Sequence, residues 1–216
     1  MLYWKDQKEK GEPGSDFALT IDAGVEMLRI TNDEFVVSSF WGPEGKDSIN
    51  PEDIVQGALG NCWILSAVSA LAEDQTRVDN LVVNEDISAH GIYGVNMYVL
   101  GVPMTVYVDD YLPTNSGKPL FAGFGKDESV WGAIVEKAFA KSYGNYQHMV
   151  GGWMATGVSR LNGSPFELKN HAGENPDFTT DDEVWAYLTE HDSKSNIITA
   201  ATTCPPGVAA EGCHTP

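Results

Sequence analysis

The residue in this sequence with the clearest capacity for chemistry is Cys62, which begins the run CWILSAVSALA. This run is apolar on nearly all helical faces, so it predicts a buried helix that starts at the cysteine. A helix N-terminus carries partial positive charge and free N–H groups, which favour a nucleophilic thiolate over the thiol. Free cysteines are often small core residues, so the helix position alone leaves both interpretations open.

The loop before Cys62 adds residues that suit acyl chemistry. Gly60 leaves room for a peptide carbonyl to approach the sulfur, and Asn61 is expected to cap the helix. Gln56 precedes the cysteine on the same loop, where its side-chain amide could join the Cys62 backbone N–H in stabilising an oxyanion. The combination QGALGNCW therefore favours a thiol nucleophile with an oxyanion site beside it.

Helices and strands are both expected around this loop. A helix is predicted over 130–143, with Glu136, Lys137 and Lys141 outside its apolar stripe. After Asp110 the pattern is that of a loop. The other expected elements are a strand at 35–37, two strands within 92–108 that turn at 101–103, a helix opening at 180, and a strand at 197–198.

Three segments, in this order, resemble the catalytic region of calpains, a family of papain-like intracellular cysteine proteases. QGALGNCWILSAVSALAE resembles the family's Gln-Gly-x-x-Gly-Asp-Cys-Trp segment and the helix that follows it. VDDYLPTNSGKPLF (108–121) is similar to its Val-Asp-Asp-x-Leu-Pro-Thr segment, and VWGAIVEKAFAKSYGNY (130–146) to its Trp-x-Ala-Leu-Leu-Glu-Lys-Ala helix. Two departures are Asn61 in place of Asp and Val150 in place of a small polar residue.

The resemblance implies an α+β, papain-like cysteine protease fold. The chain would supply mainly the helical, cysteine-bearing half with a few strands, and the β-rich His/Asn half would be truncated. The implied parts are an N-terminal segment at 1–45, the cysteine-bearing subdomain at 46–175, and the start of the second subdomain at 176–216.

The resemblance also assigns roles to single residues. Cys62 would attack the peptide carbonyl to form a thioester, and Gln56 would complete the oxyanion hole. Gly151 and Gly152 would lie beside the extended backbone of the substrate, although a simple turn explains these glycines equally well.

A thiol protease also needs a histidine as proton acceptor and donor. Of the five histidines, His214 lies nearest to the place where the family has its catalytic histidine. That family histidine opens a strand, whereas Pro216 would interrupt a strand here. The true base is therefore expected beyond the end of the chain, and the chain alone is expected to be inactive.

Calcium is a further implication of the resemblance. Asp53 stands three residues before Gln56, where the family has a calcium-binding Asp. The family's second acid does not align, because Ser129 occupies its position and Glu128 lies one residue earlier. We expect a regulatory Ca²⁺ site, weakened unless Glu128 moves into place.

The overall charge narrows the range of partners. The chain carries 31 acidic and 13 basic residues, a net charge of −18, which would repel nucleic acid and anionic lipid. Neither a signal peptide nor a membrane span is visible, and three cysteines do not suggest a disulfide framework. The expected compartment is the cytoplasm, the expected partners are protein or peptide substrates, and the oligomeric state stays open.

Two other functions compete with calcium-dependent endopeptidase activity. A calpain-like scaffold without catalysis would need neither the thiol nor the glutamine, so Cys62 and Gln56 favour the protease. A transglutaminase-like acyl transferase shares the cysteine chemistry but lacks the LGNCW and DDYLPT contexts seen here.

Overall fold

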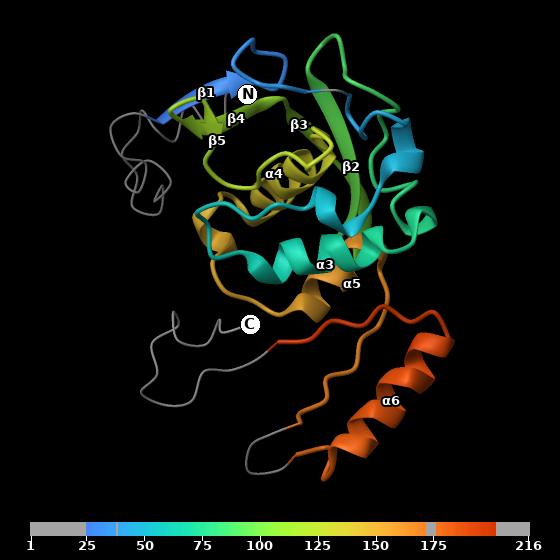
Figure 1. The fold of residues 1–216 in the computed structure, drawn as a ribbon. Coiled ribbons are helices and arrows are strands. Elements are labelled where there is room, and N and C mark those ends of the chain that lie inside the picture. Colours follow the sequence, from blue (N-terminus) through green and yellow to red (C-terminus); the bar gives the residue numbers. More distant parts are fainter. Residues whose placement is uncertain (1–24, 38, 172–175, 202–216) are drawn as a thin grey trace. The chain divides into compact units, whose positions relative to one another are not determined.

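The computed structural model describes residues 25–37, 39–171 and 176–201. The chain divides into two compact units, the first ending at Leu168 and the second beginning at Lys169. In the first unit, helices and two small antiparallel sheets share one core (Figure 1), which confirms the α+β class.

Two separate sheets make up the β structure that is described. One is a two-stranded hairpin with a register that pairs Val99 with Val102. Its turn is Leu100-Gly101, and both residues have positive φ, 53° and 79°, as a two-residue hairpin loop requires. The strands of the hairpin are β2 (Ile92–Val99) and β3 (Val102–Asp109); the other sheet has the order β1 (Val25–Arg29), β4 (Tyr111–Asn115), β5 (Lys118–Pro119).

Among the helices of the first unit, α3 (Cys62–Ala72) packs against both α4 (Trp131–Tyr143) and α5 (Met154–Asn162), and the latter two also pack against the hairpin. Helix α3 packs closely on α5: a side chain at Gly157 would lie only 2.7 Å from Ala67 Cβ. Helix α4 lies against both hairpin strands. The first unit also has 3₁₀ turns at Gly45–Ser48, Pro51–Asp53, Gln75–Arg77 and Gln147–Met149.

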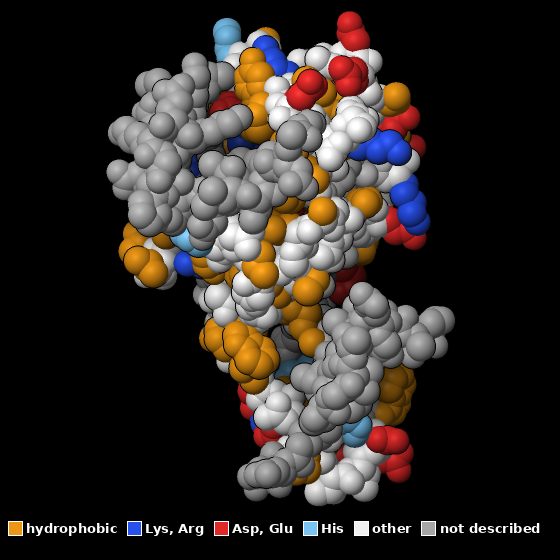
Figure 2. Space-filling view, turned by 90° about the vertical axis from the view of Figure 1, so that its left-hand side faces the viewer, with side chains coloured by type: hydrophobic (Ala, Val, Ile, Leu, Met, Phe, Trp, Pro, Cys, Tyr) orange, Lys and Arg blue, Asp and Glu red, His pale blue; other side chains and the backbone are white. Residues whose placement is uncertain are grey.

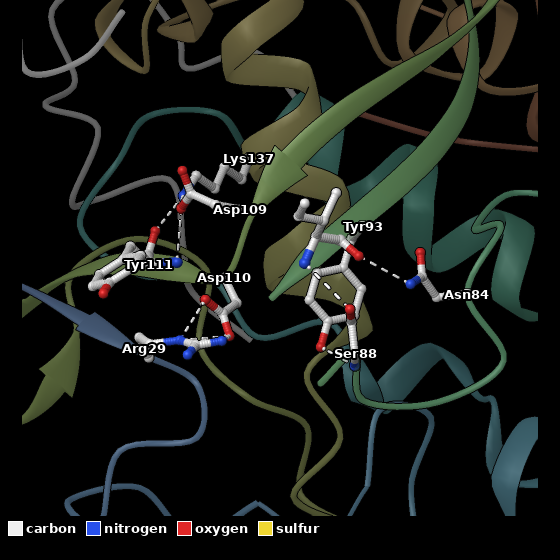
Figure 3. Close-up of polar contacts among 9 residues, drawn as sticks. Arg29, Asn84, Ser88, Tyr93, Asp109, Asp110, Tyr111 and Lys137 are labelled. Atoms are coloured by element: carbon white, nitrogen blue, oxygen red, sulfur yellow. Dashed lines mark hydrogen bonds and ion pairs between the residues drawn. The ribbon is translucent and has the colours of Figure 1, made fainter. Parts of the chain in front are cut away.

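Charged side chains tie the two sheets to α4 at the point where β3 passes into β4 (Figure 3). Asp110 is buried and accepts a forked pair of hydrogen bonds from Arg29, at the end of β1. On the other side, Lys137 of α4 donates to Asp109 at 2.6 Å and to the carbonyl of Tyr111. Three consecutive residues thus fix both sheets to the same helix.

The structure differs from the sequence-based prediction at several strands. Residues 35–37 and 197–198 form no strand, whereas β4 and β5 occupy a region predicted to be a loop. β1 was not predicted at all, and it forms because Val25 pairs with Asn115, a partner far along the chain. Such long-range pairings leave little trace in local sequence.

The second unit has one described helix, α6 (Asp181–Ser193). It opens with a capping box in which Thr180 and Glu183 each accept a hydrogen bond from the other's backbone N–H. The predicted helix start at 180 is therefore confirmed. None of its residues is buried within the described part of the chain.

The helices and the surface charge bear on what the chain can interact with. None of the described helices is long and apolar enough to cross a bilayer. On the face drawn in Figure 2, acidic side chains are interspersed with a few Lys and Arg side chains, in keeping with the net charge of −18.

The first prediction concerns Lys137, whose side chain is only 3% exposed. Substitution Lys137→Met leaves the partly buried carboxylate of Asp109 without its ion-pair partner, so the free energy of unfolding should fall by about 3 kcal/mol. Urea unfolding measures the change. Lys141→Met, one turn later on the exposed side of α4, is the matched control and should cost less than about 1 kcal/mol. Equal losses in the two variants would contradict the importance of the buried pair.

Candidate active site

Cys62 is the first residue of α3 and is exposed, while most of the helix behind it is buried. The helix begins with hydrogen bonds from Ile64 and Leu65 N–H to the carbonyl of Asn61. The N–H of Cys62 itself has no partner within the helix and none among the described residues. An exposed thiol and a backbone N–H without a partner in the described part of the chain therefore belong to the same residue.

The segment with Gly151 and Gly152 lies directly against this helix start. Gly151 N–H donates to the carbonyl of Gly60 at 2.9 Å, and Trp63 Nε1 donates to the carbonyl of Met149 at 2.8 Å. A side chain at Gly152 would collide with the Trp63 indole at 2.4 Å, so packing alone requires glycine there. Gly151 has φ of +73°, with open space where a side chain would be.

The loop that carries Gln56 is held by the segment 120–123. Val55 and Gly123 form an antiparallel bridge, and Ala58 N–H donates to the carbonyl of Leu120 at 2.9 Å. The two backbones are so close that a side chain at Gly57 would lie 1.8 Å from the carbonyl oxygen of Phe121. Gly57 is therefore required for this pairing.

The side chain of Gln56 is exposed and turned toward its own loop. Its Nε2 donates to the carbonyl of Leu59 at 3.0 Å. An amide N–H₂ has two hydrogens, so a second donor is left for an oxyanion near Cys62. The proposed contribution of Gln56 to an oxyanion hole stays a prediction.

Asn61 does not cap the helix with its side chain, contrary to the sequence-based prediction. Its side chain is buried, and Nδ2 donates instead to Glu136 Oε1 at 2.6 Å. The second carboxylate oxygen of Glu136 accepts from Ala122 N–H at 3.0 Å. Glu136 therefore connects Asn61, the residue before Cys62, to the segment 120–123, which holds the Gln56 loop.

Glu136 and Lys137 were predicted to lie outside the apolar stripe of α4, and this was wrong, because each is only 2% exposed. The sequence carried a signal: residues 131–140 are apolar or small except at these two positions, so any helix buried on all sides had to bury both charges. Buried charges need partners, which makes Glu136 and Lys137 candidate network residues.

Burial raises the pKa of Glu136 from its ordinary 4.5 to about 7, although its two hydrogen bonds lower it. The folded protein thus holds this proton over a pH range in which the unfolded chain has released it. Stability falls as pH rises from about 4.5 to about 7, by on the order of 3 kcal/mol in all. Glu136 therefore reduces the stability of the fold at neutral pH.

Asp53 is buried, and its carboxylate is already engaged as an acceptor. Asn50 donates to both of its oxygens, and Trp131 Nε1 donates to Oδ2 at 3.0 Å. Burial raises the pKa of Asp53, and the nearby Asp127 raises it further. Glu128 is exposed and has φ of +67°. Asp53 would therefore have to give up some of these hydrogen bonds before its carboxylate could bind calcium.

The described residues supply neither a metal-binding cluster nor a histidine hydrogen-bonded to the thiol. No three or more His, Cys, Asp or Glu side chains of the described chain are grouped to hold a metal ion. Within the described ranges, no histidine hydrogen-bonds to Cys62; His148 contacts the carbonyl of Tyr143 instead. His214 lies outside the described residues.

Several known proteins have sequences similar to that of this chain. Calpain-type cysteine protease DEK1 of Arabidopsis thaliana is 39% identical over 166 residues, which are 72% of this chain and 8% of that protein. The calpain-1 catalytic subunit of Sus scrofa is 32% identical over 151 residues, 67% of this chain and 20% of that protein. DEK1 of Zea mays is 39% identical over 121 residues, 56% of this chain and 6% of that protein.

The chain thus spans a fifth or less of the length of these relatives. The profile of the family described as calpain family cysteine protease matches residues 39–212, a stretch that includes Cys62 and the whole loop network around it. This chain belongs to the calpain family of cysteine proteases.

Proposed function

We propose that this chain carries the nucleophile of a cysteine-type endopeptidase that cleaves intracellular proteins. The observation that supports it is an exposed thiol on the first residue of a buried helix, with a free N–H on the same residue. Residues 149–152 lie against that helix start through the Gly60–Gly151 hydrogen bond, so an extended peptide could run along them.

In the proposed reaction the Cys62 thiolate attacks a peptide carbonyl carbon, and the carbonyl π electrons move to the oxygen. The Cys62 N–H and the second Gln56 donor stabilise that oxyanion. The intermediate collapses to a thioester when the C–N bond breaks, and the leaving amine takes a proton from a general acid. Water then hydrolyses the thioester. The acid and base belong to a histidine, which we place outside the described residues.

Two finer features follow from membership of the family and are part of the proposal. Calcium would act as a regulator through Asp53 and Glu128, which requires the carboxylate of Asp53 to exchange some of its present hydrogen bonds for the ion. The cytoplasm is the proposed compartment. A non-catalytic, calpain-like scaffold is the second candidate, because no described histidine contacts the thiol.

The second prediction is that brief iodoacetamide treatment of the folded chain labels Cys62 before Cys204 or Cys213. Exposure and the helix N-terminus both favour a reactive thiolate at Cys62. Peptide mass spectrometry reads the order of labelling.

A matched pair of probes separates protease from scaffold. A peptide that carries a chloroacetamide group should label Cys62 faster than chloroacetamide itself does, because the peptide part would bind along residues 149–152. Faster labelling of Cys204 or Cys213 by both probes would contradict the proposed nucleophile.

The third prediction is that the 216-residue chain alone cleaves a fluorogenic peptide no faster than its Cys62→Ala variant. No histidine of the described ranges hydrogen-bonds to the thiol, and without such a base, acid–base assistance worth ~10²–10⁴-fold is missing. Cleavage that Cys62→Ala abolishes would place the base within this chain, and His214→Ala would then identify it.

The fourth prediction is that calcium binds weakly, with a dissociation constant of ~10⁻⁴–10⁻³ M. Binding must displace N–H donors from Asp53, which costs affinity. Calorimetry in ~0.15 M salt, with Asp53→Ala and Glu128→Ala beside the wild type, measures it. Equal heats in all three proteins, or equal heats with Mg²⁺, would leave only diffuse attraction to an acidic surface.

A further inference from the structure

Glu136 is a buried, titratable group one hydrogen bond away from the residue that precedes the nucleophile, and the reaction described above does not use it. We propose that Glu136 is a positioning residue that sets the reactivity of Cys62, by holding Asn61 and by placing a switchable charge behind the thiol. The inference rests on the proposed function only in taking Cys62 as the nucleophile.

The geometry makes Glu136 a bridge between the two segments that would form the oxyanion site. Oε1 accepts from Asn61 Nδ2 at 2.6 Å, and Oε2 accepts from Ala122 N–H at 3.0 Å. Ala122 belongs to the segment that pairs with Val55 and Ala58, on either side of Gln56. Movement at Glu136 would therefore shift both the helix start and the Gln56 loop.

The hydrogen bonds suit the ionised carboxylate, since both partners donate and the distance to Asn61 is short. Asn61 and Glu136 can also stay hydrogen-bonded when Glu136 takes up a proton. Asn61 Oδ1 is buried and accepts no hydrogen bond from the described residues. If the amide of Asn61 rotates by half a turn, Oδ1 faces Glu136 and can accept from its protonated carboxyl.

This titration falls in the neutral range, because burial raises the pKa of Glu136 to about 7. Tyr146, from the turn after α4, is the titratable side chain that faces Glu136, and burial followed by the charge of Glu136 keeps its pKa well above the ordinary value. Asp109 also acts on Tyr146, while Lys137 is paired with Asp109. Near pH 7, therefore, Glu136 changes its charge.

The charge acts on Cys62 through the adjacent residue. Asn61 donates to Glu136 Oε1 at 2.6 Å and is the chain neighbour of Cys62, so a single residue separates the carboxylate from the residue that carries the thiol. A negative charge disfavours a second one, and ionised Glu136 therefore reduces the thiolate fraction of Cys62. When Glu136 is protonated, this repulsion is absent and the helix N-terminus still stabilises the thiolate.

The fifth prediction tests this with iodoacetamide alkylation of Cys62 between pH 5.5 and 8.5, followed by peptide mass spectrometry. In the wild type the logarithm of the rate should rise with unit slope, flatten near pH 7, and rise again. In Glu136→Gln the flattening should vanish. The two proteins should react equally at pH 5.5, and the variant on the order of threefold to tenfold faster at pH 8.5.

Glu136→Gln is expected to fold, because glutamine can accept from Ala122 N–H and donate to a rotated Asn61. Thermal melts at pH 5.5 and 8 check this, and the melting temperature of the variant relative to the wild type should increase with pH. The matched control is Glu73→Gln, at the far end of α3 with an exposed side chain, which should keep the wild-type profile.

A purely structural role would lower the melting temperature of the variant without changing the pH profile at Cys62, and that result overturns the inference. The wild-type profile is a second measurement that needs no variant, since a straight rise through pH 7 also overturns it. If iodoacetamide labels other cysteines and not Cys62, the proposed function is overturned as well. If Cys62 is labelled but its rate shows no flattening near pH 7, only the inference about Glu136 fails and Cys62 stays the proposed nucleophile.

Discussion

A buried carboxylate must receive hydrogen bonds from the protein, and this requirement organises the surroundings of Cys62. Glu136 obtains its two donors from Asn61 and Ala122, which lie on segments far apart in the sequence. Each donor brings its own segment into place, one leading into α3 and the other pairing with the Gln56 loop. The loops around the thiol thus owe their mutual position to a group that is costly to bury.

Packing supplies the stability that offsets this cost. Helix α3 buries its side chains from Trp63 to Ala72 on most faces, and α5 approaches it closely enough to require Gly157. Trp63 anchors residues 149–152 through its indole N–H as well as its ring. Cys62 stays exposed because it is the first residue of the helix, where the chain enters from the loop. A largely buried helix therefore presents the Cys62 thiol at its exposed first residue.

The sequence predicted those helices and strands whose formation depends mainly on neighbouring residues. The helices that begin near Cys62 and Trp131 follow from apolar periodicity, and the hairpin follows from strand-forming residues around Gly101. β1 could not be predicted, since its partner lies in β4 across most of the first unit. The burial of Glu136 was missed because periodicity describes one helix, whereas its partners belong to other segments.

Asn61, a departure from the family pattern, is well suited to this buried carboxylate. An aspartate at this position would place two carboxyl groups at hydrogen-bond distance in a buried site, and one of them would have to stay protonated. Asparagine removes that conflict, because its N–H₂ donates to ionised Glu136 and its carbonyl can receive a proton from the neutral form. The substitution that looked incidental beside the nucleophile therefore allows Glu136 to change its charge without losing its partner.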